Sequence, residues 1–180
     1  MPKNLSITDI NQMPNLLFVE ALGSIFEHSA WVAQAAFDQG PFTSMAQLHA
    51  TMVGIVDQAS PEQRMALIRN HPELAGKEAS AGTLTTDSRK EQSSAGLDQC
   101  SAEELSQLRA LNQTYQAKFE FPFIIAVTGL SRQNIIDALA LRVQNTSKVE
   151  FETSLVEIAK IGKIRLNALF ADCPNDGTSR

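Results

Sequence analysis

Arg165 is the charged residue that interrupts an apolar pattern near the end of the chain. It lies seven residues after Ile158 and four before Leu169, in the middle of a stripe with helical spacing. A guanidinium that faces a core must be paired, because it cannot lose its proton. One interpretation is a structural salt bridge. The other is a clamp for a small anionic ligand, since the guanidinium fork matches a carboxylate in bidentate fashion.

His71 is the second residue whose placement suggests chemistry. Pro72 follows it and disfavours helical geometry at the preceding position, so a helix must end near His71. An imidazole there titrates near neutral pH and is suited to general acid–base catalysis. The alternative is a purely structural histidine at a helix C-terminus. His28 and His49 are expected within amphipathic helices, in packing or surface roles.

Several other kinds of site are disfavoured by composition. The three histidines have no zinc-like spacing, and Cys100 and Cys173 match no metal or redox motif. The 15 Lys and Arg residues against 20 Asp and Glu give a net charge of −5, which argues against nucleic acid as a partner. The carboxylates Glu20 and Glu27 are expected on a helix surface. The mixed-charge run over residues 88–96 is typical of a solvated face.

No targeting or membrane segment is predicted. Residues 1–9 carry one Lys and no apolar run, so they do not resemble a secretory signal. No stretch approaches the roughly 18 apolar residues of a membrane span. A soluble, cytoplasmic protein is therefore expected.

The elements that must position these residues are helices. Capping residues, prolines and apolar spacing predict helices over residues 15–26, 29–37, 44–59, 60–71, 87–94, 101–115, 131–145 and 147–171. The sequence thus predicts an all-α fold, a single compact domain of roughly eight helices over residues 15–171. An N-terminal arm (1–14) precedes it and a frayed tail (172–180) follows it.

The stretch Phe119–Val127 departs from this helical pattern. It is apolar enough for a buried strand, but Pro122 in its middle and the lack of a second strand-like segment argue against one. A buried extended connector or a distorted helix is predicted instead.

Five segments, taken in order and with their spacing, resemble the OHCU decarboxylase family. They are Phe18–Trp31, His71–Gly76, Glu91–Leu97, Phe119–Val127 and Glu157–Leu166. Members of this family act on 2-oxo-4-hydroxy-4-carboxy-5-ureidoimidazoline (OHCU) and release CO2 to give (S)-allantoin, in the degradation of urate. The resemblance implies an all-α enzyme, a small ureide substrate, a homodimer, and no metal or organic cofactor.

The resemblance also implies roles for individual residues. Its catalytic histidine, glutamate and arginine fall on His71, Glu91 and Arg165. The implied substrate contacts are Pro72, Ser88, Arg89, Lys90, Gln92, Phe123, Ile124, Ile125, Ala126 and Val127. Two positions depart from the family pattern: Ala30, where Pro commonly precedes the Trp, and Thr128, where a basic residue is frequent. Both lie outside the catalytic three, so they affect the expected substrate contacts rather than the reaction.

Two alternatives to this function are open. The same His, Glu and Arg residues could serve a cofactor-free lyase or hydrolase that acts on a related ureide. The chain could also be a non-enzymatic all-α module for ureide binding or protein interaction, with Arg165 as a structural ion pair.

Overall fold

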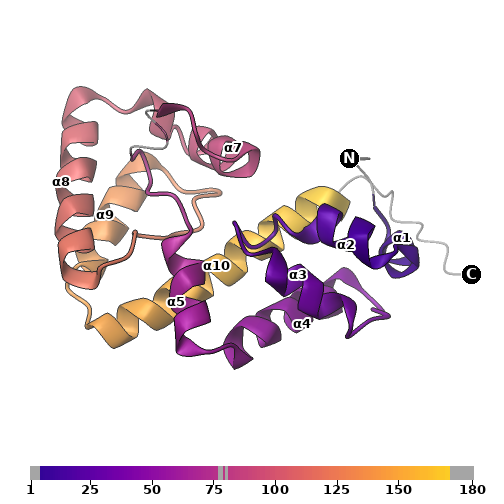
Figure 1. Ribbon diagram of the computed structural model, residues 1–180. Coiled ribbons are helices and arrows are strands. Elements are labelled where there is room, and N and C mark those ends of the chain that lie inside the picture. Colours follow the sequence, from indigo (N-terminus) through magenta and orange to yellow (C-terminus); the bar gives the residue numbers. More distant parts are fainter. Residues whose placement is uncertain (1–4, 77–78, 80, 171–180) are drawn as a thin grey trace, which may run out of the picture. The chain divides into compact units, whose positions relative to one another are not determined.

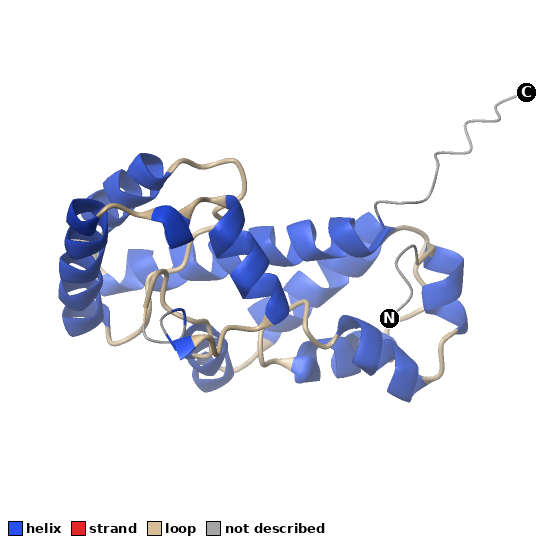
Figure 2. Ribbon diagram, turned by 90° about the horizontal axis from the view of Figure 1, so that it is seen from above, coloured by secondary structure: helices blue, strands red, loops and turns tan. Residues whose placement is uncertain are grey.

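Helices are the only regular secondary structure in the described part of the chain. The computed structural model describes residues 5–76, 79 and 81–170, and these contain helices, turns and loops but no strand (Figures 1 and 2). The longer elements are α1 (Ile7–Gln12), α2 (Asn15–Leu22), α3 (Ala30–Phe37), α4 (Met45–Gln58), α5 (Pro61–Arg69), α7 (Thr86–Ser94), α8 (Ala102–Phe119), α9 (Arg132–Arg142) and α10 (Ser147–Phe170). Eight of these described helices have at least seven residues, so the predicted all-α fold of roughly eight helices is confirmed.

The residues group into two compact units. Unit 1 comprises residues 1–60 and 161–180, and unit 2 comprises residues 61–160. Helix α10 contributes its first part to unit 2 and its last part to unit 1. The predicted boundaries after residues 14 and 171 stay predictions, and the proposed tail over 172–180 lies outside the described residues, as does Cys173.

Unit 1 is built on α2, α3 and α4, which pack in sequence order (Figure 1). The core-facing positions of α4 recur every four residues, and Leu48, Met52 and Val56 are all buried there. Phe18 of α2 packs edge-on against Phe37 of α3, with 5.4 Å between the ring centroids. Burial of these apolar side chains is the main stabilising contribution in this unit.

Helix α2 ends earlier than the apolar spacing predicts. The helix was expected to reach residue 26, but it ends at Leu22 and a turn follows over residues 23–28. Ile25 and Phe26 are still buried, so their spacing reflects the packing of the turn rather than a helix. His28 has φ of +52° in this turn, and the prediction that it lies within a helix is therefore wrong.

Unit 2 contains α5, α7, a 3-10 turn (Leu97–Gln99), α8, α9 and the first part of α10. Its core centres on Tyr115 of α8, which is fully buried and contacts the rings of Phe119, Phe121 and Phe123. After α8 the chain runs through residues 120–127 without regular secondary structure. The predicted buried connector is thus confirmed.

None of the described helices combines the length and the hydropathy needed to cross a lipid bilayer.

Candidate functional site

His71 lies on the bend that follows α5 and is only 6% exposed. Its Nδ1 is 3.0 Å from the carbonyl oxygen of Leu67, one turn earlier. Because a carbonyl oxygen can only accept, the Nδ1–H must donate this hydrogen bond. The bond fixes the tautomer and orients the ring, which makes Nε2 the nitrogen that can exchange a proton with a ligand.

The turn after His71 is attached to two helices. The backbone N–H of Ala75 donates to Oε1 of Gln92 on α7 at 3.0 Å. The side-chain amide of Asn112 on α8 donates to the carbonyl of Leu74 at 3.0 Å. Ala75 has φ of +50°, a conformation that these bonds help to maintain. The His71 segment is therefore held against the helix that carries Glu91.

Helix α7 divides its candidate residues between two faces. Ser88 and Gln92 are four residues apart and both are buried, whereas Arg89 and Lys90 are exposed. Glu91 is half-buried. The Ser88 N–H donates a hydrogen bond to the side-chain oxygen of Thr85, which caps the helix start.

The Arg89 side chain bonds the loop that precedes its own helix, α7. Its guanidinium donates to the carbonyl oxygen of Gly82 at 2.9 Å. A second contact reaches the carbonyl of Leu84 at 3.4 Å. These bonds support the loop before α7, and the substrate contacts expected of Arg89 and Lys90 stay predictions.

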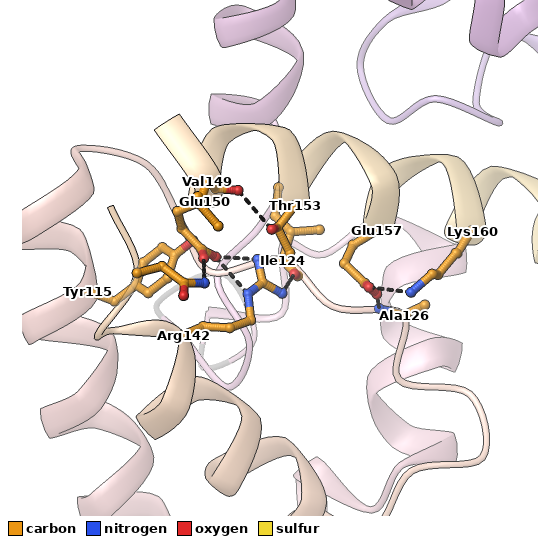
Figure 3. A network of polar contacts seen from close by, with 10 residues as sticks. Tyr115, Ile124, Ala126, Arg142, Val149, Glu150, Thr153, Glu157 and Lys160 are labelled. Atoms are coloured by element: carbon orange, nitrogen blue, oxygen red, sulfur yellow. Dashed lines mark hydrogen bonds and ion pairs between the residues drawn. The ribbon is translucent and has the colours of Figure 1, made fainter. Parts of the chain in front are cut away.

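The connector after α8 is held by groups from α9 and α10 (Figure 3). The carbonyl of Ile124 accepts a hydrogen bond from the Arg142 guanidinium at 2.6 Å. The N–H of Ala126 donates to Oε2 of Glu157 at 2.8 Å. Phe123, Ile124 and Val127 are buried, while Pro72, Ile125 and Ala126 are half-buried.

A buried polar network around Glu150 supports this arrangement (Figure 3). Glu150 is completely buried, and it accepts hydrogen bonds from Tyr115 at 2.6 Å, from Arg142 Nε at 2.6 Å and from Asn145 at 2.8 Å. The Arg142 guanidinium also lies 4.6 Å from the centroid of the Phe123 ring. Burial, and secondly the hydrogen bond to Glu150, raise the pKa of Tyr115 well above its usual value.

Sequence reasoning missed this network, although a signal was present. Glu150, Ser154 and Glu157 follow one another at spacings of four and three residues beside the apolar stripe of α10. All three are buried. Carboxylates on the core side of a helix require partners, just as Arg165 does.

Arg165 belongs to unit 1, where it forms a buried ion pair. It is 5% exposed, and its NH2 donates to Oε2 of Glu27 at 2.8 Å. Its NH1 donates to the carbonyl oxygen of Ser24 at 3.2 Å. Glu27 is only 2% exposed, so the expectation that it lies on a helix surface is wrong. The reason is the early end of α2, which directs the turn over residues 23–28 inward.

Gly162 allows this turn to approach α10 closely. A Cβ on Gly162 would lie 3.4 Å from the Phe26 ring and 3.6 Å from Ile25. Because the turn approaches α10 closely at this point, Glu27, which follows Phe26, lies within hydrogen-bond distance of Arg165. The buried, paired Arg165 fits the structural interpretation directly, and its role as a substrate clamp stays a prediction.

Two cavities lie beside the His71 turn within unit 2. The larger, about 840 Å³, is lined by residues that include Glu73, Gly76 and Arg109. The smaller, about 500 Å³, is lined by residues that include Arg89 and Gln92. His71 and Glu91 are absent from both linings. Within the described residues, no group of three or more His, Cys, Asp and Glu side chains is arranged to hold a metal ion.

Comparison with known proteins assigns the family. A sequence model described as OHCU decarboxylase matches residues 11–167, which span both units. The chain belongs to the OHCU decarboxylase family. The resemblance found in the five sequence segments is thereby confirmed.

Two relatives differ in how much of their own length the match covers. The uric acid degradation bifunctional protein PucL of Bacillus subtilis is 40% identical over 89% of this chain, and the match covers 32% of that protein. A 2-oxo-4-hydroxy-4-carboxy-5-ureidoimidazoline decarboxylase of Halalkalicoccus jeotgali is 37% identical, over 97% of this chain and 96% of that protein. The chain therefore spans about a third of the bifunctional relative and nearly all of the other.

Solved structures of OHCU decarboxylase relatives share the fold. A crystal structure of (S)-allantoin synthase aligns with a TM-score of 0.75 at 29% identity, covering 92% of this chain and 54% of that one. A crystal structure of an OHCU decarboxylase in the presence of (S)-allantoin aligns with a TM-score of 0.68 at 26% identity, covering 89% and 100%.

Proposed function

We propose that this protein catalyses the cofactor-independent decarboxylation of OHCU to (S)-allantoin in urate degradation. The observation that carries the proposal is the environment of His71. It is a buried imidazole whose Nδ1 donates to Leu67, on a turn that Gln92 attaches to the helix of Glu91. Membership of the family and relatives named for this reaction support the same conclusion.

The proposed reaction needs a proton donor and an anchor for an anion. Breaking the bond to the carboxylate leaves an electron pair on the substrate ring, and the product must then receive a proton on one face. His71, through Nε2, is suited to exchange that proton near neutral pH. Glu91 is proposed to hold the substrate hydroxyl or to destabilise the nearby carboxylate. Arg165 is proposed to bind the anionic substrate by charge-assisted hydrogen bonds.

The connector is proposed to recognise the ureide through its backbone. Ile124 and Ala126 already use one polar group each within the chain. Among the described residues no backbone partner is found for the N–H groups of Ile125 and Val127. These groups are proposed to bind the carbonyl oxygens of the substrate, together with contacts from Pro72 and the residues of α7.

The direct test is a turnover assay with freshly generated OHCU. The wild-type protein should accelerate loss of OHCU and should yield (S)-allantoin rather than the racemate, measured by absorbance and circular dichroism. His71→Ala, Glu91→Ala and Arg165→Ala should each abolish turnover and keep the helical dichroism. Arg165→Lys should also fail, because an ammonium cannot reproduce a bidentate fork. Near-normal turnover in all three alanine variants would contradict the site assignment.

One observation favours the non-enzymatic binding module as the second candidate. That alternative expects Arg165 to be a structural ion pair, and Arg165 does pair with Glu27. A binding module would bind allantoin or a related ureide tightly without accelerating OHCU loss. Calorimetric binding and the turnover assay on one preparation separate the two functions.

We further propose that the protein is a cytoplasmic homodimer. Large apolar side chains are exposed on unit 2, with Leu141 73%, Val149 50% and Val156 55% exposed. The two valines are seven residues apart and so share one face of α10. Val156→Lys should shift the sedimentation coefficient toward that of a monomer, whereas an unchanged value would exclude this face as the interface.

A further inference from the structure

We infer that Glu157 is a positioning residue that sets the backbone conformation of residues 123–127 for substrate recognition. The inference deepens the proposed function and rests on it. Glu157 belongs to none of the residues expected to touch substrate, yet its carboxylate bonds the middle of the segment expected to do so.

Two hydrogen bonds hold the connector, at backbone groups of residues that are two positions apart. The Ile124 carbonyl accepts from Arg142, and the Ala126 N–H donates to Glu157 (Figure 3). Ile125 lies between these two residues in the sequence. The two bonds hold the backbone on both sides of Ile125. They therefore restrict the orientation of the Ile125 N–H and C=O, for which no bond within the described residues is found.

The surroundings of Glu157 hold its carboxylate in place beside Ala126. The residue is only 8% exposed, and its two carboxylate oxygens have different partners. Oε2 accepts from Ala126 at 2.8 Å, and Oε1 accepts from Nζ of Lys160 at 2.6 Å, one turn along α10. A charge-assisted bond to a backbone N–H is stronger than a neutral one. The lysine restricts the carboxylate rotamer, so the Ala126 N–H has a fixed acceptor.

Glu150 supplies the second anchor indirectly. It pairs with Arg142, and Arg142 in turn bonds the Ile124 carbonyl. Glu150 and Glu157 are seven residues apart and so lie on one face of α10. A single rigid helix thus sets two successive fixed points of the connector. A ureide offers adjacent N–H and C=O groups, and an Ile125 held in this orientation presents a complementary pair.

The test compares KM and kcat of four variants, measured under conditions in which all four are equally folded. Glu157→Ala removes the acceptor, and Glu157→Gln keeps an amide oxygen that can accept from Ala126. Lys160→Ala removes the ion pair alone. Glu152→Ala is the matched control, an exposed carboxylate on the same helix that pairs with Arg64.

We expect Glu157→Ala to raise KM by at least about tenfold while kcat changes by less than about threefold. The dissociation constant of (S)-allantoin, measured by calorimetry, should rise in parallel. Glu157→Gln should recover most of the loss, and Lys160→Ala should lie between Glu157→Gln and the wild type. Amide hydrogen exchange at Ala126 should accelerate in Glu157→Ala and remain slow in Glu152→Ala.

Two outcomes would contradict the positioning role of Glu157 and leave the proposed function unaffected. In the first, the wild type turns over OHCU and Glu157→Ala has the KM of Glu152→Ala. In the second, Glu157→Gln is as impaired as Glu157→Ala, with an equal fall in Tm, which indicates a structural charge rather than a positioned backbone. A wild-type protein without turnover would instead overturn the proposed function itself.

Discussion

At Arg165 and Glu27, two charges are removed from water together. Their exposed fractions are 5% and 2%, and the 2.8 Å bond between them joins residues 138 positions apart. Desolvation of both charges offsets much of their attraction, so the pair adds little net stability. Removing only one member is different, because the other stays buried without its opposite charge.

The first prediction concerns this pair. Glu27→Ala should lower the free energy of unfolding by about 3 kcal/mol, because the guanidinium stays buried without its carboxylate. The double variant Glu27→Ala with Arg165→Met should be more stable than the sum of the single losses implies. Urea denaturation followed by circular dichroism measures all four proteins of this cycle. Strict additivity would show that the two side chains are not energetically coupled.

At the scale of elements, helix starts are set by local side-chain bonds. Helices α1, α8 and α9 each begin with a reciprocal capping box, formed by Ser6 with Asp9, Ser101 with Glu104, and Ser131 with Asn134. In α8 the Ser101 hydroxyl accepts from the Glu104 N–H at 3.1 Å. The hydrogen bond from the Ser101 N–H, and then the bond from Arg132, hold the pKa of Glu104 below its usual value.

The second prediction tests the α8 cap. Ser101→Ala should lower the free energy of unfolding by about 1 kcal/mol, because one backbone N–H at the helix start loses its acceptor. Ser106→Ala is the matched control, since Ser106 is exposed within the same helix. Thermal unfolding measures the difference, and KM and kcat should not change. Equal stability of the two variants would contradict the role of the cap.

Local signals of this kind explain which features could be predicted from sequence. The Ser101–Glu104 pattern, the Ser60–Pro61 step and Pro122 each act within a few residues, and the helices and the connector were predicted from them. The end of α2 was not, because the turn after it is as apolar as a helix. The partners of Arg165 and Glu157 were not predicted either, because Glu27 and Ala126 are brought to them by tertiary folding alone.

At the scale of the whole molecule, Tyr115 links high-pH behaviour to unfolding. It is the only tyrosine in the chain, and its pKa is raised above 10.0, first by burial and then by the hydrogen bond to Glu150. The folded protein therefore retains this proton at a pH where the unfolded chain releases it. Stability from this group is complete below pH 10.0 and declines as the pH rises further.

The third prediction follows from the direction of the Tyr115 pKa shift. Tyrosinate absorbance should appear only together with loss of helical dichroism, because the folded state does not ionise Tyr115 in the same range. Tyr115→Phe should be less stable at neutral pH by about 1 kcal/mol, since Glu150 loses one of its donors. The decline in its stability above pH 10.0 should be shallower than in the wild type. Tyrosinate absorbance that rises before unfolding would contradict this prediction.

The division of unit 1 between two distant stretches of the sequence has a consequence for protein synthesis. Glu27 is translated 138 residues before Arg165, which corresponds to a delay on the order of ten seconds. During that interval the nascent chain has α1 to α4 without the last part of α10, and the Glu27 carboxylate lacks its bond to Arg165. Glu27 must remain hydrated until the last part of α10 has been synthesised, so unit 1 acquires its native packing only after residues 161–170 have been added.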